Sequence, residues 1–195
     1  MLAFSREQTT APQALCACEL LESLRILVRP LLGHQVQFQV VPCEPGLIAE
    51  YDKRQMLDVM VNLCSNAAEA MKDGGTITVW ADAAVYDGAR YVRIKVEDQG
   101  DGMDDETLRL AFEPFFSTRD DHDHAGLGLP ASDAIVRQNG GQLKISSEPG
   151  KGTTVEILLP AVAKRNSDES GEPNPGTSKA ATILVAEDEP ALLDL

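Results

Sequence analysis

Positive charge is scarce in this sequence. Lys and Arg together number 17 against 31 Asp and Glu, which gives a formal net charge of -14 over 195 residues. Such a surface repels the phosphates of nucleic acids and the headgroups of anionic lipids. We therefore expect neither nucleic acid nor a membrane surface as a partner of this chain, although its charge still permits a local site for phosphate groups.

Long apolar runs are also missing. No run approaches the roughly 18 to 20 apolar residues that a membrane-spanning helix requires. The opening residues, MLAFSREQTT, lack the apolar centre of a secretory signal. We expect a cytoplasmic domain, and if the parent protein is anchored in a membrane, the anchor lies outside this piece.

Cysteine is rare, and its spacing matches no metal-binding motif. The four residues are Cys16, Cys18, Cys43 and Cys64, and Cys64 falls inside a helical apolar pattern. Small secreted domains use cysteines as a disulfide framework, whereas cytosolic proteins keep them reduced. We therefore interpret all four as reduced thiols of a cytosolic protein.

A regular apolar periodicity is present. Hydrophobic residues make up 43% of the chain, enough to bury a core without disulfides. Helical spacing predicts helices over residues 15–32, 52–71, 104–111 and 130–139. Alternation of apolar and polar residues predicts strands over residues 35–41, 47–51, 75–81, 90–97, 142–147 and 152–159.

The order of these elements predicts an α+β fold. We expect the strand at 47–51 to pair beside 35–41, and the strands at 75–81 and 90–97 to form a hairpin. Hairpins of this kind argue against a simple doubly wound topology. The expected architecture is a two-layer α/β sandwich, a mixed sheet with helices on one face and the other face open or covered by a segment absent here.

Composition also divides the chain into parts. The periodic region, residues 15–160, ends near Pro160, and residues 161–180 carry many Pro, Gly and Ser but almost no large apolar side chain, which is typical of a linker. The run ATILVAEDE follows within residues 181–195. It predicts the first strand of a further, truncated domain; a chance apolar stretch followed by acids is the alternative.

One polar stripe interrupts the apolar pattern of the helix at 52–71. In NLCSNAAEAM, Asn62, Asn66 and Glu69 are spaced so that they share one side of the helix. Amide and carboxylate oxygens are ligands of Mg²⁺, which also retains waters and phosphate oxygens. The stripe therefore indicates either a site for magnesium and a triphosphate or an ordinary solvated face.

A second motif follows the strand at 90–97. In VEDQGDGMDDE, Asp98 ends the strand, and Gly100 and Gly102 turn the chain. An aspartate there can accept a hydrogen bond from the exocyclic amine of adenine, and the glycines let the backbone approach the base. Glycine-rich turns after strands are common, so this motif alone does not identify a nucleotide site.

A third motif involves residues 112–125, a polar loop too long to be a simple connection. Phe112, Phe115 and Phe116 open this lid loop, and Gly126-Leu127-Gly128-Leu129 follows at the start of a helix. Glycines at a helix N-terminus expose backbone amides that suit phosphate oxygens. The aromatics are candidates to anchor a lid, but aromatic loops are also ordinary plugs of a core.

The order of these motifs, with Gly152-Thr153 opening the last strand, resembles the N, G1, F and G2 boxes of one ATP-binding domain, the Bergerat fold. That domain is shared by histidine kinases, gyrase B, the heat-shock chaperone of the ninety-kilodalton class and the MutL proteins. FEPFFST with GLGL resembles the histidine kinases in particular. Over about residues 15–160, the resemblance implies the catalytic domain of an ATP-dependent protein-histidine kinase, with ATP and Mg²⁺ as cofactors.

The resemblance also implies a role for each site residue. Asn66 would coordinate Mg²⁺, and Asn62 and Glu69 would flank the phosphates and metal, so these three form the implied catalytic group. Asp98 would hold the adenine amine, and Thr153 would lie near adenine through water. The other implied nucleotide-binding residues are Gly100, Gly102, Met103, Thr118, Gly126, Leu127 and Gly128.

Two positions depart from relatives in this superfamily. His124-Ala125 stands where Gly-Thr usually precedes Gly-Leu-Gly. Asn62 stands where the ATP-hydrolysing relatives carry a glutamate general base, and an amide cannot abstract a proton at neutral pH. Asn62 therefore favours phosphoryl transfer to a protein. A catalytically impaired nucleotide-binding module and an ATPase of the gyrase or MutL type are the alternatives.

The acceptor of the phosphoryl group is expected outside this chain. None of the histidines, His34, His122 and His124, lies in the helical context of an acceptor. The opening LAFSREQ resembles the end of a dimerisation hairpin, so residues 1–14 are expected to finish that hairpin and link it to the catalytic domain.

At the other end, ILVAEDE resembles the first strand of a receiver domain, with Glu187 and Asp188 as its magnesium-binding acids. The parent would then be a hybrid kinase. The implied partners are its own histidine-containing hairpin and receiver domain, and a downstream phosphotransfer or response-regulator protein.

Overall fold

A five-stranded mixed sheet forms the centre of the fold, in a computed structural model that describes residues 12–117 and 126–162. Its strands are β2 Val36–Val40, β4 Gly75–Tyr86, β5 Ala89–Glu97, β6 Gln142–Glu148 and β7 Gly152–Pro160. Their order is β2-β4-β5-β7-β6, in which β2 runs parallel to β4 and the other neighbours are antiparallel.

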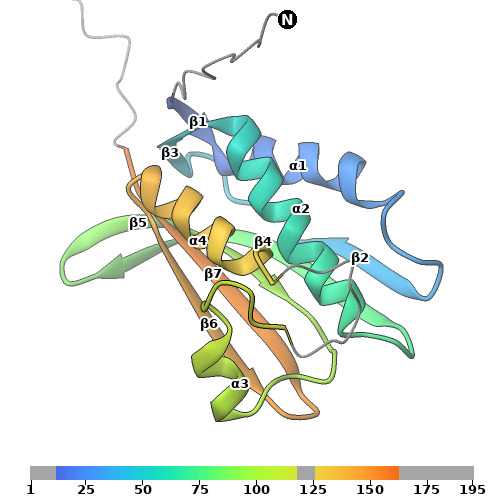
Figure 1. The fold of residues 1–195 in the computed structure, drawn as a ribbon. Helices are drawn as coiled ribbons and strands as arrows, with labels where there is room; N and C mark the ends of the chain where they lie inside the picture. Colours follow the sequence, from blue (N-terminus) through green and yellow to red (C-terminus); the bar gives the residue numbers. More distant parts are fainter. Residues whose placement is uncertain (1–11, 118–125, 163–195) are drawn as a thin grey trace, which may run out of the picture. The chain divides into compact units, whose positions relative to one another are not determined.

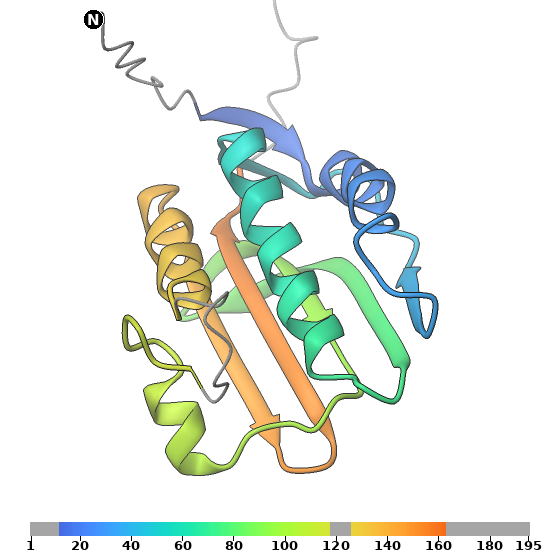
Figure 2. The same cartoon turned by 45° about the vertical axis from the view of Figure 1, so that its right-hand side comes forward.

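Helices cover one face of this sheet, as Figures 1 and 2 show. They are α1 Ala17–Val28, α2 Lys53–Glu69 and α4 Gly128–Gln138, and the short α3 Asp105–Leu110 lies at the end of the sheet beside β6. The predicted two-layer α+β fold is confirmed. Within the described residues, no helix is long and apolar enough to cross a membrane.

The helix α2 carries several of the predicted site residues, and its position on the sheet follows from the apolar side chains that it buries. Asp52 precedes it as the N-cap residue, and the Asp52 side-chain oxygen accepts the backbone N–H of Gln55 at 3.0 Å. Each large apolar side chain that it buries contributes about 1.5–3 kcal/mol, so the helix cannot roll on the sheet without a large loss. The buried stripe consists of Met56, Val59, Met60, Leu63, Cys64 and Ala67.

A second, two-stranded sheet differs from the prediction. Residues 13–16 form strand β1, Gln13–Cys16, and pair antiparallel with β3, Ile48–Tyr51. The expected helix therefore begins only at Ala17, and β3 does not pair with β2. Periodicity missed this arrangement because a strand of four residues is too short to show a pattern. Long-range contacts hold it: the Tyr51 hydroxyl donates to the Cys16 carbonyl at 3.1 Å.

The predicted hairpin of β4 and β5 is confirmed and is longer than expected. Strand β4 continues to Tyr86, and the turn is made by Asp87 and Gly88. Both turn residues have positive φ, 48° and 78°, which matches the twist of a two-residue hairpin loop.

The prediction that all four cysteines are reduced is wrong for two of them. Cys18 at the start of α1 and Cys43 after β2 form a disulfide, with their Cα atoms 5.6 Å apart. The sequence did not reveal the pair because 25 residues separate the two positions and only the packing of α1 beside β2 brings them together. Cys16 and Cys64 are free, and burial raises the pKa of the Cys64 thiol to about 12.

The sheet face opposite the helices is polar. Arg93 on β5 makes a two-pronged contact with Asp82 on β4, at 2.8 Å and 2.6 Å. Lys95, also on β5, pairs with Glu156 on β7 at 2.5 Å and lies 5.5 Å from the centre of the Trp80 ring. These cross-strand pairs agree with the prediction that this face carries no helix.

Candidate nucleotide-binding site

A cavity of about 590 Å³ opens between α2, the start of α4 and the sheet. Its apolar wall includes Leu63 of α2, Val96 of β5, and Ile145 and Val155 of the last hairpin. Such a wall suits a planar aromatic base. Of the predicted site residues, Asn62, Asn66, Glu69, Asp98, Gly102, Met103, Gly126, Leu127, Gly128 and Thr153 line the cavity.

Asp98 is the most specific polar group of this cavity, since its residue is 6% exposed and it follows directly on β5. Its Oδ1 accepts backbone N–H groups from Gly100 at 2.9 Å and from Thr153 at 3.2 Å. Because Oδ1 is engaged twice, Oδ2 is left to meet a ligand. Burial raises the pKa of this carboxyl, and the two backbone donors partly offset that effect.

The loop after Asp98 packs closely against the β6–β7 turn. Gly102 has φ +66°, and a side chain on it would place Cβ 2.0 Å from the carbonyl oxygen of Glu148. Only glycine permits this approach.

A Cβ on Gly100 would lie 2.7 Å from the carbonyl oxygen of Ala70. Gly100, which was predicted to border the base, instead lies buried against α2 and does not line the cavity.

Ser147 is a residue that the sequence analysis missed. Its hydroxyl accepts the backbone N–H of Met103 at 2.8 Å, donates to the carbonyl of Gly152 at 3.0 Å and lies 2.9 Å from the Thr153 hydroxyl. This side chain of β6 therefore links the loop after Asp98 to the start of β7. Its place at the end of a strand before a tight turn was the available signal, but Ser is frequent there.

The polar stripe of α2 faces the same cavity. Asn62 is half-buried and Asn66 is exposed, and both line the cavity together with Glu69. The Ser65 hydroxyl donates to Glu69 Oε1 at 3.2 Å. The Asn62 side-chain amide donates to the hydroxyl of Ser132 on α4 at 3.0 Å. The three predicted residues are thus brought together, about two helical turns from end to end.

The start of α4 forms the opposite wall. Gly128 begins the helix, and a Cβ there would lie 2.5 Å from Asn62 Oδ1. Gly126 accepts the backbone N–H of Phe115 at 3.0 Å, so the two described ends of the lid loop meet at this point. Thr118, His122 and His124 lie outside the described residues.

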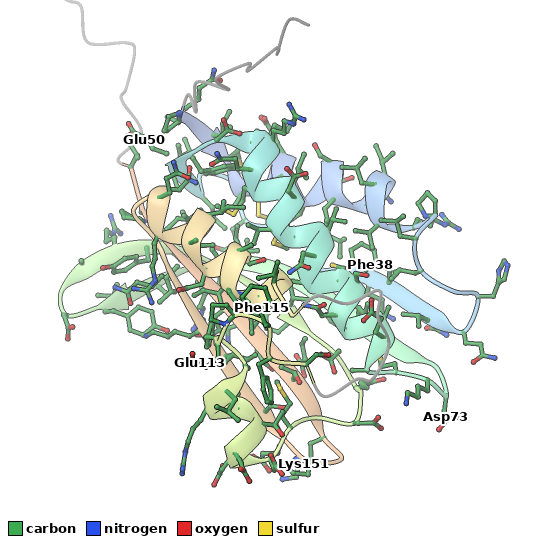
Figure 3. All side chains as sticks on the ribbon, viewed as in Figure 1. Phe38, Glu50, Asp73, Glu113, Phe115 and Lys151 are labelled. Carbon is green, nitrogen blue, oxygen red and sulfur yellow. A yellow bond between two sulfur atoms is a disulfide. The ribbon has the colours of Figure 1, made fainter. Side chains whose placement is uncertain are left out.

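The three aromatic residues of the lid motif have different environments. Phe112 packs against the core, and Phe116 lines the cavity. Phe115 is 76% exposed and lies near the start of α4, as Figure 3 shows. Phe112 and Phe116 are therefore the aromatics of this motif that contact the core or the cavity, and an anchoring role for any of the three stays a prediction.

The side-chain oxygens that line the cavity fit a magnesium ion that protein and phosphate oxygens would coordinate together. In the described part of the chain, no group of three His, Cys, Asp or Glu side chains could bind a metal alone. Lys72, which sequence analysis missed, is the only Lys or Arg among the described lining residues, against Glu69, Asp98 and Asp101. A triphosphate therefore needs a counter-cation here, and Mg²⁺ typically uses one or two protein oxygens plus phosphate oxygens and waters.

Comparison with known proteins agrees with this geometry. The model of the family of histidine kinase-, DNA gyrase B- and HSP90-like ATPases matches residues 51–163, more than half of the chain. The chain belongs to this family. Its curated relatives include sensor kinases, and the domain is of the type that sensor histidine kinases carry.

Sensor kinase CckA of Brucella abortus (strain 2308) is 36% identical over 98% of this chain and 22% of its own length. Sporulation kinase C of Bacillus subtilis (strain 168) is 36% identical over 59% of this chain and 26% of its own length. The chain thus spans about a quarter of these relatives.

Solved structures share the fold. Full-length ShkA in complex with AMPPNP matches with a TM-score of 0.65 at 25% identity, over 80% of this chain and 32% of that chain. The mycobacterial sensor histidine kinase MprB matches with a TM-score of 0.63 at 23% identity, over 77% of this chain and 97% of that chain.

Proposed function

We propose that this chain binds Mg-ATP and transfers the γ-phosphoryl group to a histidine on the dimerisation hairpin of its parent protein, in two-component signalling. The observation that carries the proposal is Asp98, a buried carboxylate whose Oδ1 is held by two backbone donors and whose Oδ2 is left for the exocyclic amine of adenine. The AMPPNP complex of the structural neighbour ShkA supports a nucleotide in this cavity.

The other residues divide between base and phosphates. Met103 and Thr153 lie at the Asp98 end, while Asn62, Asn66 and Glu69 lie on α2 facing Gly126 and Gly128. Asn66 would supply an oxygen ligand for Mg²⁺, with Asn62 and Glu69 flanking the metal and the phosphates, and the bound ion would neutralise phosphate charge. The backbone amides at the start of α4 bind phosphate oxygens.

Transfer is favoured over hydrolysis because the described cavity places an amide, Asn62, next to the start of α4. An amide does not activate water at neutral pH, so catalysis consists mainly of positioning and charge neutralisation. The run ILVAEDE supports, within this proposal, a hybrid parent in which residues 181–195 begin a receiver domain. The downstream partner would be a phosphotransfer or response-regulator protein.

The test is phosphoryl transfer in trans. The chain is incubated with γ-labelled ATP, Mg²⁺ and the separately expressed dimerisation hairpin of the parent, and acid-labile label on the hairpin is measured. We expect labelling with wild type, loss of at least about a hundredfold with Asn66→Ala, and no change with His34→Ala, an exposed histidine outside the cavity.

Release of inorganic phosphate without labelling of the hairpin would instead identify a hydrolase. Nucleotide binding with neither reaction would identify the second candidate, a catalytically impaired nucleotide-binding interaction module. The replacement of Gly-Thr by His124-Ala125 before Gly126 favours that candidate.

A further inference from the structure

One hydrogen bond at the phosphate end of the cavity is not explained by the proposed roles. The Asn62 amide donates to the hydroxyl of Ser132, in the second turn of α4, at 3.0 Å. Ser132 is 2% exposed and does not line the cavity. A hydroxyl buried to that extent is costly unless it is hydrogen-bonded, and Asn62 supplies a partner.

The same amide is confined from a second direction. A Cβ on Gly128 would lie 2.5 Å from Asn62 Oδ1 and 3.1 Å from Nδ2. Gly128 and Ser132 are four residues apart on α4, so they lie on one side of that helix. The Asn62 amide therefore fits between them, with Nδ2 bonded to Ser132 and Oδ1 against the backbone of the first turn.

We propose that Ser132 is a positioning residue for phosphoryl transfer, since it fixes the rotamer in which Asn62 meets the phosphates. This inference rests on the proposed function. Without the hydroxyl, Asn62 keeps its place on α2 but its amide is free to rotate away from the start of α4.

A merely structural role for Ser132 is disfavoured, because the far end of α4 has its own polar contacts with α2. The Asn139 side chain accepts the backbone N–H of Asp52 at 2.8 Å and donates to Gln55 at 3.3 Å. The packing of α4 on α2 therefore does not depend on the one hydrogen bond between Asn62 and Ser132.

The test uses an isosteric pair. Ser132→Thr and Ser132→Val add similar bulk, but only Thr keeps the hydroxyl. We expect the single-turnover transfer rate to fall about tenfold in Ser132→Val relative to Ser132→Thr, because misplacement of a catalytic group slows the reaction while leaving nucleotide affinity within about twofold. Equal rates in the two variants, or an equal loss of affinity and rate, would overturn the proposal.

Should the added bulk prevent folding of both variants, Ser132→Ala takes their place. Compared with wild type and with Asn62→Ala, it should slow transfer in the wild-type background and have no further effect when Asn62 is absent. A full effect of Ser132→Ala in the Asn62→Ala background would contradict positioning through Asn62.

A second readout separates this inference from the proposed function. The side-chain NH₂ resonances of Asn62 are recorded by ¹⁵N NMR in wild type and Ser132→Ala, with no acceptor protein present. We expect slow solvent exchange of one amide hydrogen in wild type and at least about tenfold faster exchange in the variant. Identical exchange would refute the hold of Ser132 on Asn62, whereas slow exchange in a chain that transfers no phosphate would show that the hold exists and that the proposed function is wrong.

Discussion

The two ends of the cavity are built in different ways. At the proposed adenine end, Asp98, Met103 and Thr153 are joined by backbone hydrogen bonds and by the Ser147 hydroxyl. At the proposed phosphate end, side chains of α2 face the first turn of α4, and one hydrogen bond, from Asn62 to Ser132, links the two helices there in the described residues.

This difference corresponds to two tasks. Recognition of a base gains from donors and acceptors fixed in advance, since little ordering is then needed on binding. Phosphoryl transfer depends on interactions that are stronger in the transition state than in the ground state, so the side chains at the phosphate end should affect the rate more than the affinity. The adenine end should accordingly be intolerant of backbone change, and the phosphate end should lose rate before it loses affinity.

The largest expected effect is at the adenine end. Gly102→Ala forces a Cβ into the Glu148 carbonyl at a left-handed φ. We expect the free energy of unfolding to fall by about 4 kcal/mol and nucleotide binding to be lost. Urea unfolding and calorimetry measure both. The control is Gly33→Ala, where a Cβ meets nothing within 4 Å; similar losses in both variants would contradict the close packing described at Gly102.

Removal of the disulfide should lower stability while leaving both ends of the cavity unchanged. Cys43→Ser opens a link across 25 residues, and we expect a loss of about 3 kcal/mol in the free energy of unfolding. Nucleotide affinity should stay within about twofold, because neither Cys18 nor Cys43 lines the cavity.

The free Cys16→Ser variant serves as control. If thiol labelling of the unfolded, unreduced protein finds four reactive cysteines, the disulfide is absent in solution and this prediction fails.

At the phosphate end, Gly128→Ala should mainly affect rate. Its Cβ would meet the Asn62 side chain, which can move, and Gly128 does not have the left-handed φ of Gly102. We expect transfer to slow about tenfold with little change in stability, because the amide is displaced from its place beside α4. Single-turnover kinetics measure this. An unfolded Gly128→Ala protein would contradict the expected difference between the two ends, namely loss of stability at Gly102 and loss of rate at Gly128.

The smallest expected effect is a pH dependence that arises at the adenine end. Burial raises the pKa of Asp98 above the 3.8 of an unperturbed carboxyl, so the folded protein retains this proton while the unfolded chain releases it. Stability attributed to Asp98 is therefore complete below pH 3.8 and decreases as the pH rises through the raised value. Asp98→Asn removes this slope. Urea unfolding of both proteins between about pH 4 and 7 should show that the wild type loses stability relative to Asp98→Asn as the pH rises. Parallel pH profiles of the two proteins would contradict a raised pKa of Asp98.

Much of the architecture could be predicted from sequence because it depends on local patterns. The stripe of α2, from Met56 to Ala67, and the alternation in β4 to β7 follow directly from periodicity. The resemblance implied that the motifs around Asp98 and Gly128 bind one nucleotide, and both line the same cavity.

What the sequence could not show depends on contacts between distant residues. The pairing of β1 with β3 and the disulfide between Cys18 and Cys43 both join segments that are far apart in the sequence. Ser132 and Ser147 carry no motif, and their importance comes from the residues that the fold places beside them, Asn62 and Thr153.

Calorimetric titration of Mg-ATP tests the central claim most directly, with wild type, Asp98→Asn and Asp101→Asn. In Asp98→Asn the amide oxygen stays with the two backbone donors, so the NH₂ group faces the adenine amine and a donor opposes a donor. We predict a loss of affinity of at least about 30-fold. Asp101 also lines the cavity but is exposed, so Asp101→Asn should bind within about twofold of wild type. Unchanged binding by Asp98→Asn, or an equal loss in both variants, would contradict the placement of adenine at Asp98.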